Sequence, residues 1–152
     1  MVKSLHRESD YREILQRLSG LEEKSTPRWG KMNAACMLEH CMRVLQIPLG
    51  KVLLPETSGF VRWIGMLTRT EMRLFNNGIP RNMPTYKVLK VECEVDFDEA
   101  MKNLLRALGT YQELVRNNEL PATHQLFGSM EPEDWGFMEY KHINHHLKQF
   151  GL

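Results

Sequence analysis

The stretch YKHINHHLKQF, residues 140–150, places two histidines one helical turn apart, at His142 and His146. Side chains four residues apart on a helix point in the same direction, with Cβ atoms about 5–6 Å apart. Two imidazoles held in this way can bind one divalent metal ion. Of all the patterns in the chain this one has the most specific chemistry, and it predicts a metal site on a helix.

Helical geometry separates this pair from the third histidine of the stretch. With about 100° between successive residues, His142 and His146 fall within an apolar arc, and His145 falls at its polar edge. The arc also contains Trp135, Ile143, Leu147 and Phe150, whereas Lys141, Asn144 and Lys148 lie opposite. The pattern therefore selects His142 and His146 rather than the adjacent pair.

A third histidine, His40, is predicted to face the core from a different helix, over residues 33–46. It shares its helical face with Cys36, Met37, Val44 and Ile47, and Glu39 and Gln46 lie on the far side. A buried imidazole needs partners for its polar nitrogens. A metal ion shared by all three histidines would supply one, and a hydrogen-bonded core histidine is the alternative interpretation for His40.

Apolar spacing and capping residues predict five helices. They cover residues 4–18, 33–46, 57–76, 96–115 and 132–151. Between the third and fourth helices, Leu89, Val91, Cys93 and Val95 alternate with polar residues, which indicates an extended or short strand-like stretch. A single strand would have no partner. We therefore expect an all-α fold, a four-helix bundle with one additional helix and a long crossover connection, formed by residues 1–152 as a single domain.

Composition excludes several classes of partner. Lys and Arg number 20 against 19 Asp and Glu, with no basic stripe, which argues against nucleic acid. No apolar run is long enough to span a bilayer, and the N-terminus does not resemble a signal peptide, so no membrane partner is expected. Cys36, Cys41 and Cys93 have neither CxxC spacing nor an even count, which indicates reduced thiols in a cytoplasmic protein.

Several motifs resemble the DinB-like superfamily of metalloenzymes. The stretch His142-Ile143-Asn144-His145-His146-Leu147-Lys148-Gln149 resembles the HxxxHxxQ motif that ends its last bundle helix. Trp29-Gly30-Lys31-Met32, leading to Met37-Leu38-Glu39-His40, resembles its second helix. More closely, residues 124–128, 132–135 and 140–152 resemble one subgroup, a bacterial family of unassigned function.

This resemblance implies a bundle of DinB-like topology in which three histidines bind a divalent metal ion, often zinc, nickel or iron. Matched position by position, the ligands are His40, His142 and His146, the residues that helical geometry also selects. Characterised relatives include enzymes that use low-molecular-weight thiols as transferases or isomerases, others have no established activity, and members are often dimers. The resemblance thus implies a metal-dependent thiol transferase acting on a small molecule, and a homodimer.

Three reaction roles remain open for such a site. Three neutral imidazoles leave a metal ion with its full positive charge and an open position. Such an ion can activate a thiol for transfer to an electrophilic carbon, or water for hydrolysis of an acyl or amide bond. The resemblance favours thiol transfer. Hydrolysis is one alternative, and a non-catalytic bundle in which the metal only joins two helices is another.

Two further residues are candidate catalytic groups. Glu139, beside His146 on the helical wheel, is predicted to orient a ligand imidazole or to act as a base. Its alternative role is favourable charge near the helix N-terminus. His124, in the loop before the last helix, is predicted to contact substrate or to be a surface histidine. Gln149 lies on the histidine face and is predicted to hydrogen-bond a ligand or an interior group.

Other side chains near these motifs have a structural and a functional interpretation. Cys36, one turn before His40, is either a fourth ligand that closes a structural zinc site or a small buried thiol. Trp29, Phe127 and Trp135 either form the walls of a pocket or belong to the core.

Overall fold

The computed structural model describes residues 2–76, 78–82, 85–91 and 94–152, and nearly all the regular structure in these ranges is helical. The helices are α1 (Glu8–Leu18), α2 (Ala34–Leu45), α3 (Gly59–Phe75), the short 3-10 helix η1 (Lys87–Leu89), α4 (Phe97–Asn117) and α5 (Pro132–Gln149). The strands β1 (Thr123–His124) and β2 (Gly128–Ser129) form a small antiparallel hairpin. The all-α prediction is confirmed.

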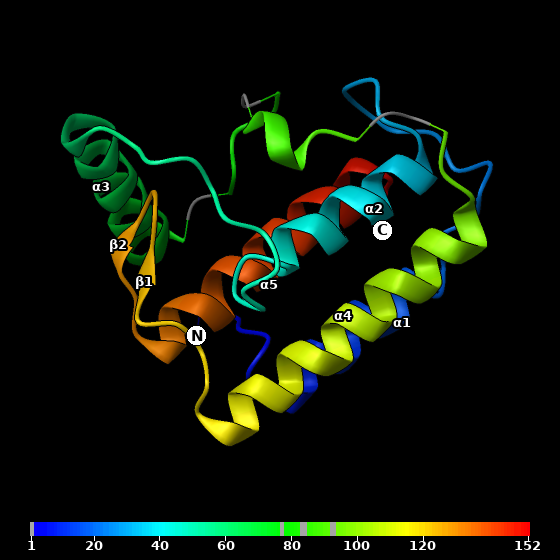
Figure 1. Cartoon of the computed structure of the whole chain (residues 1–152). Coiled ribbons are helices and arrows are strands. Elements are labelled where there is room, and N and C mark those ends of the chain that lie inside the picture. Colours follow the sequence, from blue (N-terminus) through cyan, green and yellow to red (C-terminus); the bar gives the residue numbers. More distant parts are fainter. Residues whose placement is uncertain (1, 77, 83–84, 92–93) are drawn as a thin grey trace.

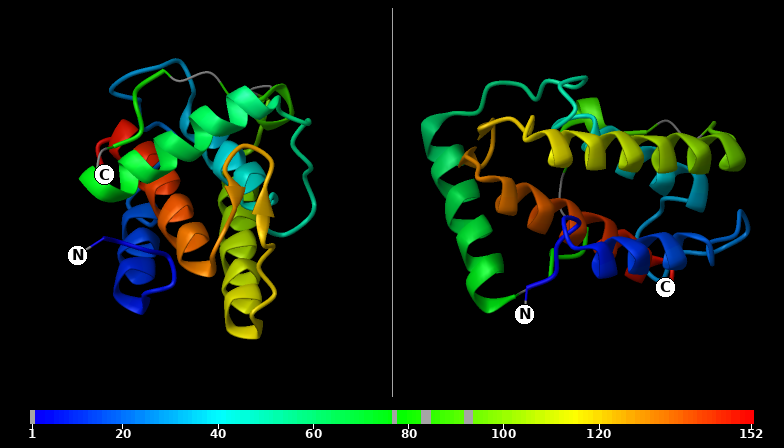
Figure 2. Two further views of the ribbon diagram at one scale, coloured as in Figure 1. Left: turned by 90° about the vertical axis from the view of Figure 1, so that its left-hand side faces the viewer. Right: turned by 90° about the horizontal axis from the view of Figure 1, so that it is seen from below.

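Four of the helices surround one hydrophobic core. Helix α2 packs along α4, and α5 contacts both α1 and α2, so that α1, α2, α4 and α5 lie alongside one another (Figure 1). Helix α3 lies apart from them and runs across one end of the group (Figure 2). The core contains Ile14 and Leu18, Met37, Leu38 and Leu45, Leu104 and Leu108, and Ile143 and Leu147. The additional helix of the prediction is therefore α3.

Capping side chains begin the helices where the sequence predicted. The Asn33 side chain accepts a hydrogen bond from the Cys36 amide (2.8 Å), and the Asp96 side chain accepts one from the Glu99 amide (2.8 Å). Each cap satisfies a backbone N–H that has no partner within its own helix. Helix α1, however, begins at Glu8 and not at Ser4.

The turn before α1 explains the later start. The amide of Ser4 donates to a carboxylate oxygen of Asp10 (2.9 Å), and the Arg7 side chain donates to the same oxygen (2.8 Å). The Leu5 amide donates to the carbonyl of Gly136 on α5 (3.0 Å). These bonds use the backbone of residues 4 and 5 outside a helix, and they attach the N-terminal segment to α5.

The expected strand-like stretch before α4 is not a strand in the part of it that the structure describes. Leu89 is buried as the last residue of η1, and Lys90, Val91 and Val95 are in no regular element. Cys93 lies outside the described residues. Leu89 packs against α2, and the extended backbone of Lys90 fits the extended alternative of the prediction.

Polar contacts hold α3 against α5 and the hairpin. Arg69 and Arg73 form ion pairs with Asp134, and the Lys141 ammonium donates to the Asn76 carbonyl (3.0 Å) at the end of α3. At Gly65 the helix comes so close to the hairpin that an added Cβ would lie 2.5 Å from the Leu126 carbonyl oxygen. Only a glycine permits this approach.

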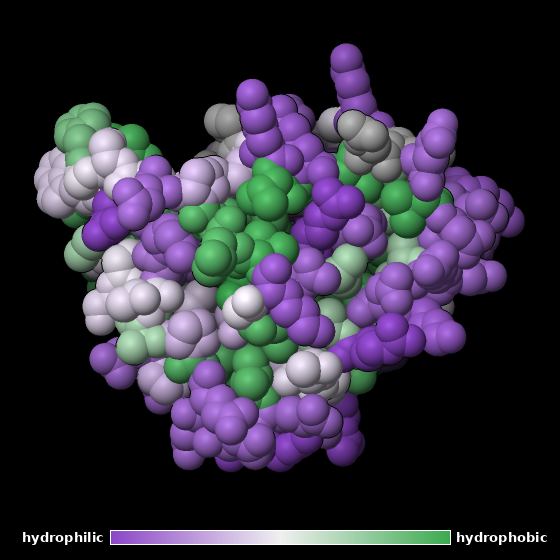
Figure 3. All heavy atoms as spheres, viewed as in Figure 1, coloured by the Kyte–Doolittle hydropathy of each residue, from purple (hydrophilic) through white to green (hydrophobic). Residues whose placement is uncertain are grey.

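The apolar side chains of α3 are mostly outside the core. Phe60 is 70% exposed and Trp63 is 57% exposed, and Gly65 and Met72 are the buried residues of the helix. The N-terminal end of α3 accordingly presents hydrophobic atoms at the upper left of the space-filling view (Figure 3). In the described part of the chain, no helix combines the length and the apolar character that crossing a membrane requires.

We expect Gly136→Ala to destabilise the protein by about 1–3 kcal/mol, because overpacking forces neighbouring atoms apart. A Cβ at this position would lie 2.3 Å from the Ser4 Oγ and 2.7 Å from the His6 ring. Gly109→Ala is the matched control, since nothing lies within 4 Å of its Cβ on α4, and it should stabilise by about 0.5–1 kcal/mol. Urea unfolding would measure both; equal effects of the two changes would contradict the packing described here.

Candidate metal centre

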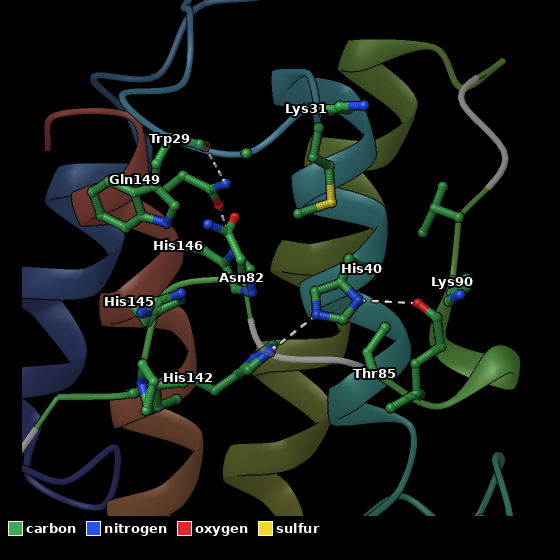
Figure 4. A pocket seen from close by; sticks show the side chains of 16 residues that line it. Trp29, Lys31, His40, Asn82, Thr85, Lys90, His142, His145, His146 and Gln149 are labelled. Atoms are coloured by element: carbon green, nitrogen blue, oxygen red, sulfur yellow. Dashed lines mark hydrogen bonds between the residues drawn. The ribbon is translucent and has the colours of Figure 1, made fainter.

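Three imidazoles from two helices meet at one point. His40 projects from α2, and His142 and His146 project from α5, so that one nitrogen of each lies within 4.8 Å of the others (Figure 4). The Nε2 atoms of His40 and His142 are 3.1 Å apart. The ring centroids are 4.7–5.0 Å apart in all three pairs. Among the described residues, the sequence-predicted set is therefore brought together.

Ordinary helix packing produces this convergence. His40 is buried on the core face of α2, with Met37 and Cys41 beside it in the sequence and also buried. His146 is buried next to Leu147 on α5. Because α2 and α5 are in contact, side chains on their facing surfaces must meet. The hydrophobic residues around the histidines thus place the three rings.

Hydrogen bonds at Nδ1 orient two of the rings. His40 Nδ1 lies 3.0 Å from the Leu89 carbonyl, and His146 Nδ1 lies 2.9 Å from the Gln149 side-chain oxygen. Both partners are acceptors, so Nδ1 carries the proton and donates in each case. The lone pair of each ring is then on Nε2, which faces the other histidines. The Gln149 amide in turn donates to the Trp29 carbonyl (2.8 Å).

The third ring lacks such a partner. His142 Nδ1 is buried and has no hydrogen-bond partner among the described residues. A nitrogen of this kind usually donates to a carboxylate, a carbonyl or a bound molecule when the other nitrogen binds metal. The unpaired atom therefore marks a place where something else is expected to bind.

Burial keeps the three imidazoles neutral. It lowers the pKa of His40, and it lowers the pKa of His142 well below its usual value, with repulsion from His146 adding to the effect. Burial, followed by repulsion from His40, lowers the pKa of His146 to about 3. Neutral rings with inward lone pairs are the form that metal ions bind. The donor set thus fits a divalent metal ion.

A large cavity opens onto the histidines. Its volume is about 800 Å³. It lies between α2, α5, the loop that begins at Trp29 and the segment that begins at Ile79. Trp29 forms part of its wall, with the Arg81 guanidinium 4.2 Å from the centre of its ring. His145 lies against Trp29, at a ring distance of 5.6 Å. Lys31 and Lys90 also line this space (Figure 4), so its rim is positively charged.

The family model described as "Protein of unknown function (DUF1569)" matches residues 2–151. The chain belongs to this family. Neither the curated proteins nor the solved structures gave a match. Membership of the DUF1569 family names no activity, so function has to be inferred from the site.

A second cavity of about 310 Å³ lies behind His142 in this DUF1569 chain, and Glu139 lines it. Glu139 is buried, and burial raises the pKa of its carboxyl to about 8, so that it is largely protonated at pH 7. Its Oε2 has no hydrogen-bond partner among the described residues. The two predicted roles of Glu139, to orient a ligand imidazole and to act as a base, both stay predictions.

His124 is buried in β1, so the alternative that it is a surface histidine is wrong. Its Nδ1 accepts hydrogen bonds from the amides of Leu126 (3.0 Å) and Phe127 (3.3 Å), which shapes the turn of the hairpin. Burial, assisted by the charge of Arg69, lowers its pKa to about 4. His124 lines the second cavity, apart from the three-histidine group, and its contact with substrate stays a prediction.

For the remaining candidates, the structure favours the structural interpretation in one case and the functional one in the others. Cys36 is fully buried and is not part of the three-histidine group, which favours the buried-thiol interpretation. Trp29 lines the larger cavity, and Phe127 and Trp135 line the smaller one, so the predicted pocket walls are confirmed. Gln149 hydrogen-bonds His146, as one of its two predicted roles required.

Sequence reasoning missed the contribution of the loop after α3. The Leu89 carbonyl orients His40, and Ile79 and Pro80 line both cavities. A backbone carbonyl has no sequence signature, because every residue has one. The one indication in the sequence was the apolar alternation around Leu89, which we interpreted as a strand.

We expect the metal-free DUF1569 protein to lose stability as the pH falls below about 6.5. The pKa of His146 is about 3 in the folded chain and about 6.5 when unfolded, so the unfolded chain binds the proton first. The contribution of His146 is complete above pH 6.5 and should fall by about 2 kcal/mol between pH 7 and pH 4.5. Urea unfolding in the presence of a chelator would measure it. His146→Gln should show a shallower pH dependence, and parallel curves for the two proteins would contradict the burial of a neutral imidazole.

Proposed function

We propose that this DUF1569 protein is a metal-dependent enzyme in which His40, His142 and His146 bind one divalent metal ion. The proposed reaction is transfer of a low-molecular-weight thiol to a small molecule, as in enzymes of the DinB-like superfamily that the sequence resembles. The observation that carries the proposal is the meeting of three neutral imidazole nitrogens within 4.8 Å at the wall of a large cavity.

The number of protein ligands favours catalysis over a structural role. Structural zinc sites have four protein ligands, whereas catalytic sites have three and an open position. The group found here contains three histidines and excludes Cys36. All three histidines line the 800 Å³ cavity, so an open position would be accessible to a small molecule. This arrangement supports the proposal of a reactive centre.

The three imidazoles narrow the choice of metal ion to a group of transition metals. Imidazole suits zinc, copper, iron and nickel, and three imidazoles do not distinguish among them. The resemblance favours zinc, nickel or iron. Bound by neutral ligands, such an ion would lower the pKa of a thiol at the open position and favour its thiolate.

The chain itself would bind and orient the thiol. Many low-molecular-weight thiols carry carboxylates, and Lys31 and Lys90 are among the residues that line the cavity. Gln149 and the Leu89 carbonyl would fix the ligand rings, because each accepts a hydrogen bond from an Nδ1. In the transfer, the sulfur forms a bond to the electrophilic carbon, and the leaving group departs with its electron pair. The thiol proton passes to solvent.

Two alternatives use the same residues. A hydrolase would activate water at the open position in place of a thiol. A non-catalytic bundle would use the metal only to join α2 and α5, and it would need a fourth protein ligand to close the site. The cytoplasmic location and the homodimer implied by the sequence and the resemblance remain predictions, as does the DinB-like topology.

Protein purified without a histidine tag should contain close to one equivalent of divalent metal, measured by elemental analysis. His40→Ala and His146→Ala should each lose most of it, because two imidazoles alone bind weakly. His145→Ala is the matched control, since His145 lies one residue from His146 but outside the three-histidine group. Equal metal content in all four proteins would rule out the proposed centre. Loss of metal in Cys36→Ala would favour the closed structural site.

Metal-loaded protein should accelerate the reaction of a carboxylate-bearing thiol such as glutathione or cysteine with a small alkyl halide. Lys31→Ala with Lys90→Ala should raise the KM for the thiol with a smaller effect on kcat, because these groups lie at the rim and not at the metal. Thiol consumption by a colorimetric assay would follow the rate. Hydrolysis of an ester without thiol would support the hydrolase, and no turnover with either would support the non-catalytic bundle.

A further inference from the structure

The second cavity has the features of a binding site for a small molecule. Its volume of about 310 Å³ falls at the lower end of the range of about 300–1,000 Å³ usual for ligand sites. Protein interiors rarely contain voids larger than a water molecule. A space of this size would hold about ten waters by liquid volume, and its walls would offer them few partners.

The walls are almost entirely apolar. They come from four parts of the chain: the end of α2, α3, the loop after α3, and the hairpin with α5. The apolar lining includes Val44, Ile47, Met72, Leu126, Met130 and Met138. Aliphatic and thioether side chains of this kind favour an uncharged hydrocarbon ligand. A charged ligand would lose its hydration here without compensation.

Four polar side chains interrupt this lining, those of Thr68, His124, Glu139 and His142. Thr68 and His124 have hydrogen-bond partners, whereas Glu139 and His142 each have a buried atom without one in the described part of the chain. The two atoms are Glu139 Oε2 and His142 Nδ1. A buried polar atom without a partner costs free energy, so native structures contain few. Both lie on α5, three residues apart and thus on the same side of the helix. A ligand with one hydroxyl could donate to His142 Nδ1 or accept from it, according to the tautomer of the ring, and could also hydrogen-bond the carboxyl of Glu139.

The cavity adjoins the histidine centre. His142 lines both cavities, and Ile79 and Pro80 do so as well. When the Nε2 of His142 faces the other histidines, its Nδ1 is on the other side of the ring. A molecule bound behind His142 would therefore touch the imidazole that takes part in the centre.

We propose that the 310 Å³ cavity binds a compact, uncharged, largely hydrocarbon molecule with a single hydroxyl group, which meets Glu139 and His142. Because the cavity adjoins the centre, a molecule of this class that also carries a carbon with a leaving group, such as a halide, would be the second substrate for the thiol transfer: the thiol sulfur bonds to that carbon and the leaving group departs with its electron pair. This last role rests on the proposed function, whereas the binding itself does not.

The test uses 2-naphthol as the probe and naphthalene as its analogue without the hydroxyl. Calorimetry on the full chain should show 2-naphthol binding with one site and at least tenfold lower Kd than naphthalene. Thr68→Phe, which fills the cavity from α3, should weaken both by tenfold or more. Thr70→Phe is the matched control, because Thr70 is exposed on the same helix and its hydroxyl makes the same kind of bond to the preceding turn.

Variants at Glu139 test the polar contact. In Glu139→Leu the preference for 2-naphthol over naphthalene should fall to nearly one, and Glu139→Gln should retain part of it. Val44→Phe fills the same cavity from α2 and replaces Thr68→Phe if that variant does not fold. No binding of 2-naphthol, equal binding of both probes, or full binding in both filled variants would overturn the proposal.

The distance between bound 2-naphthol and the histidine centre can be tested with a paramagnetic metal ion. In protein loaded with Co²⁺, the proton signals of bound 2-naphthol should be broadened by the paramagnetic ion, and not in the zinc form. His40→Ala should lose the broadening but keep the calorimetric binding. If Co²⁺ does not bind at all, the proposed function fails while calorimetry still decides the cavity. If Co²⁺ binds and calorimetry shows no 2-naphthol, only the present inference fails.

Discussion

The site depends on the mutual burial of three imidazoles between α2 and α5. Burial and repulsion among the rings make protonation unfavourable, which leaves neutral nitrogens within 4.8 Å of one another. Three lone pairs in so small a space are unfavourable unless they share a proton or a cation. The fold supplies the hydrophobic packing that holds α2 and α5 together, and the three histidines between them could hold a metal ion.

The structure around the site consists of a four-helix core and of segments attached to that core. The core of α1, α2, α4 and α5 fixes the two helices that carry the histidines. Helix α3, the hairpin and the loop after α3 are attached to this core largely by polar contacts, among them the ion pairs of Asp134 and the bonds from Lys141 to Asn76. The loop after α3 lines both cavities, and α3 and the hairpin line the smaller one, whereas the three histidines lie on the core helices α2 and α5.

Two adjoining spaces of different character fit a reaction between two unlike molecules. The larger has lysines at its rim and suits an anionic thiol, and the smaller is apolar with one buried carboxyl. His142 belongs to both. The raised pKa of Glu139, to about 8, fits a group that donates a hydrogen bond in an apolar setting.

The positions of most helices and the burial of the three histidines followed from local sequence. The 3.6-residue period of apolar residues and the caps at Asn33, Ser58 and Asp96 determined where helices form, and the same period placed His40, His142 and His146 on buried faces. Those are properties of single helices, which sequence spacing encodes. The burial of His124, the two cavities, and the unpartnered state of Glu139 depend on which segments pack together. No spacing encodes that, because it arises from contacts between residues as far apart as Leu89 and His40, or Trp29 and Gln149.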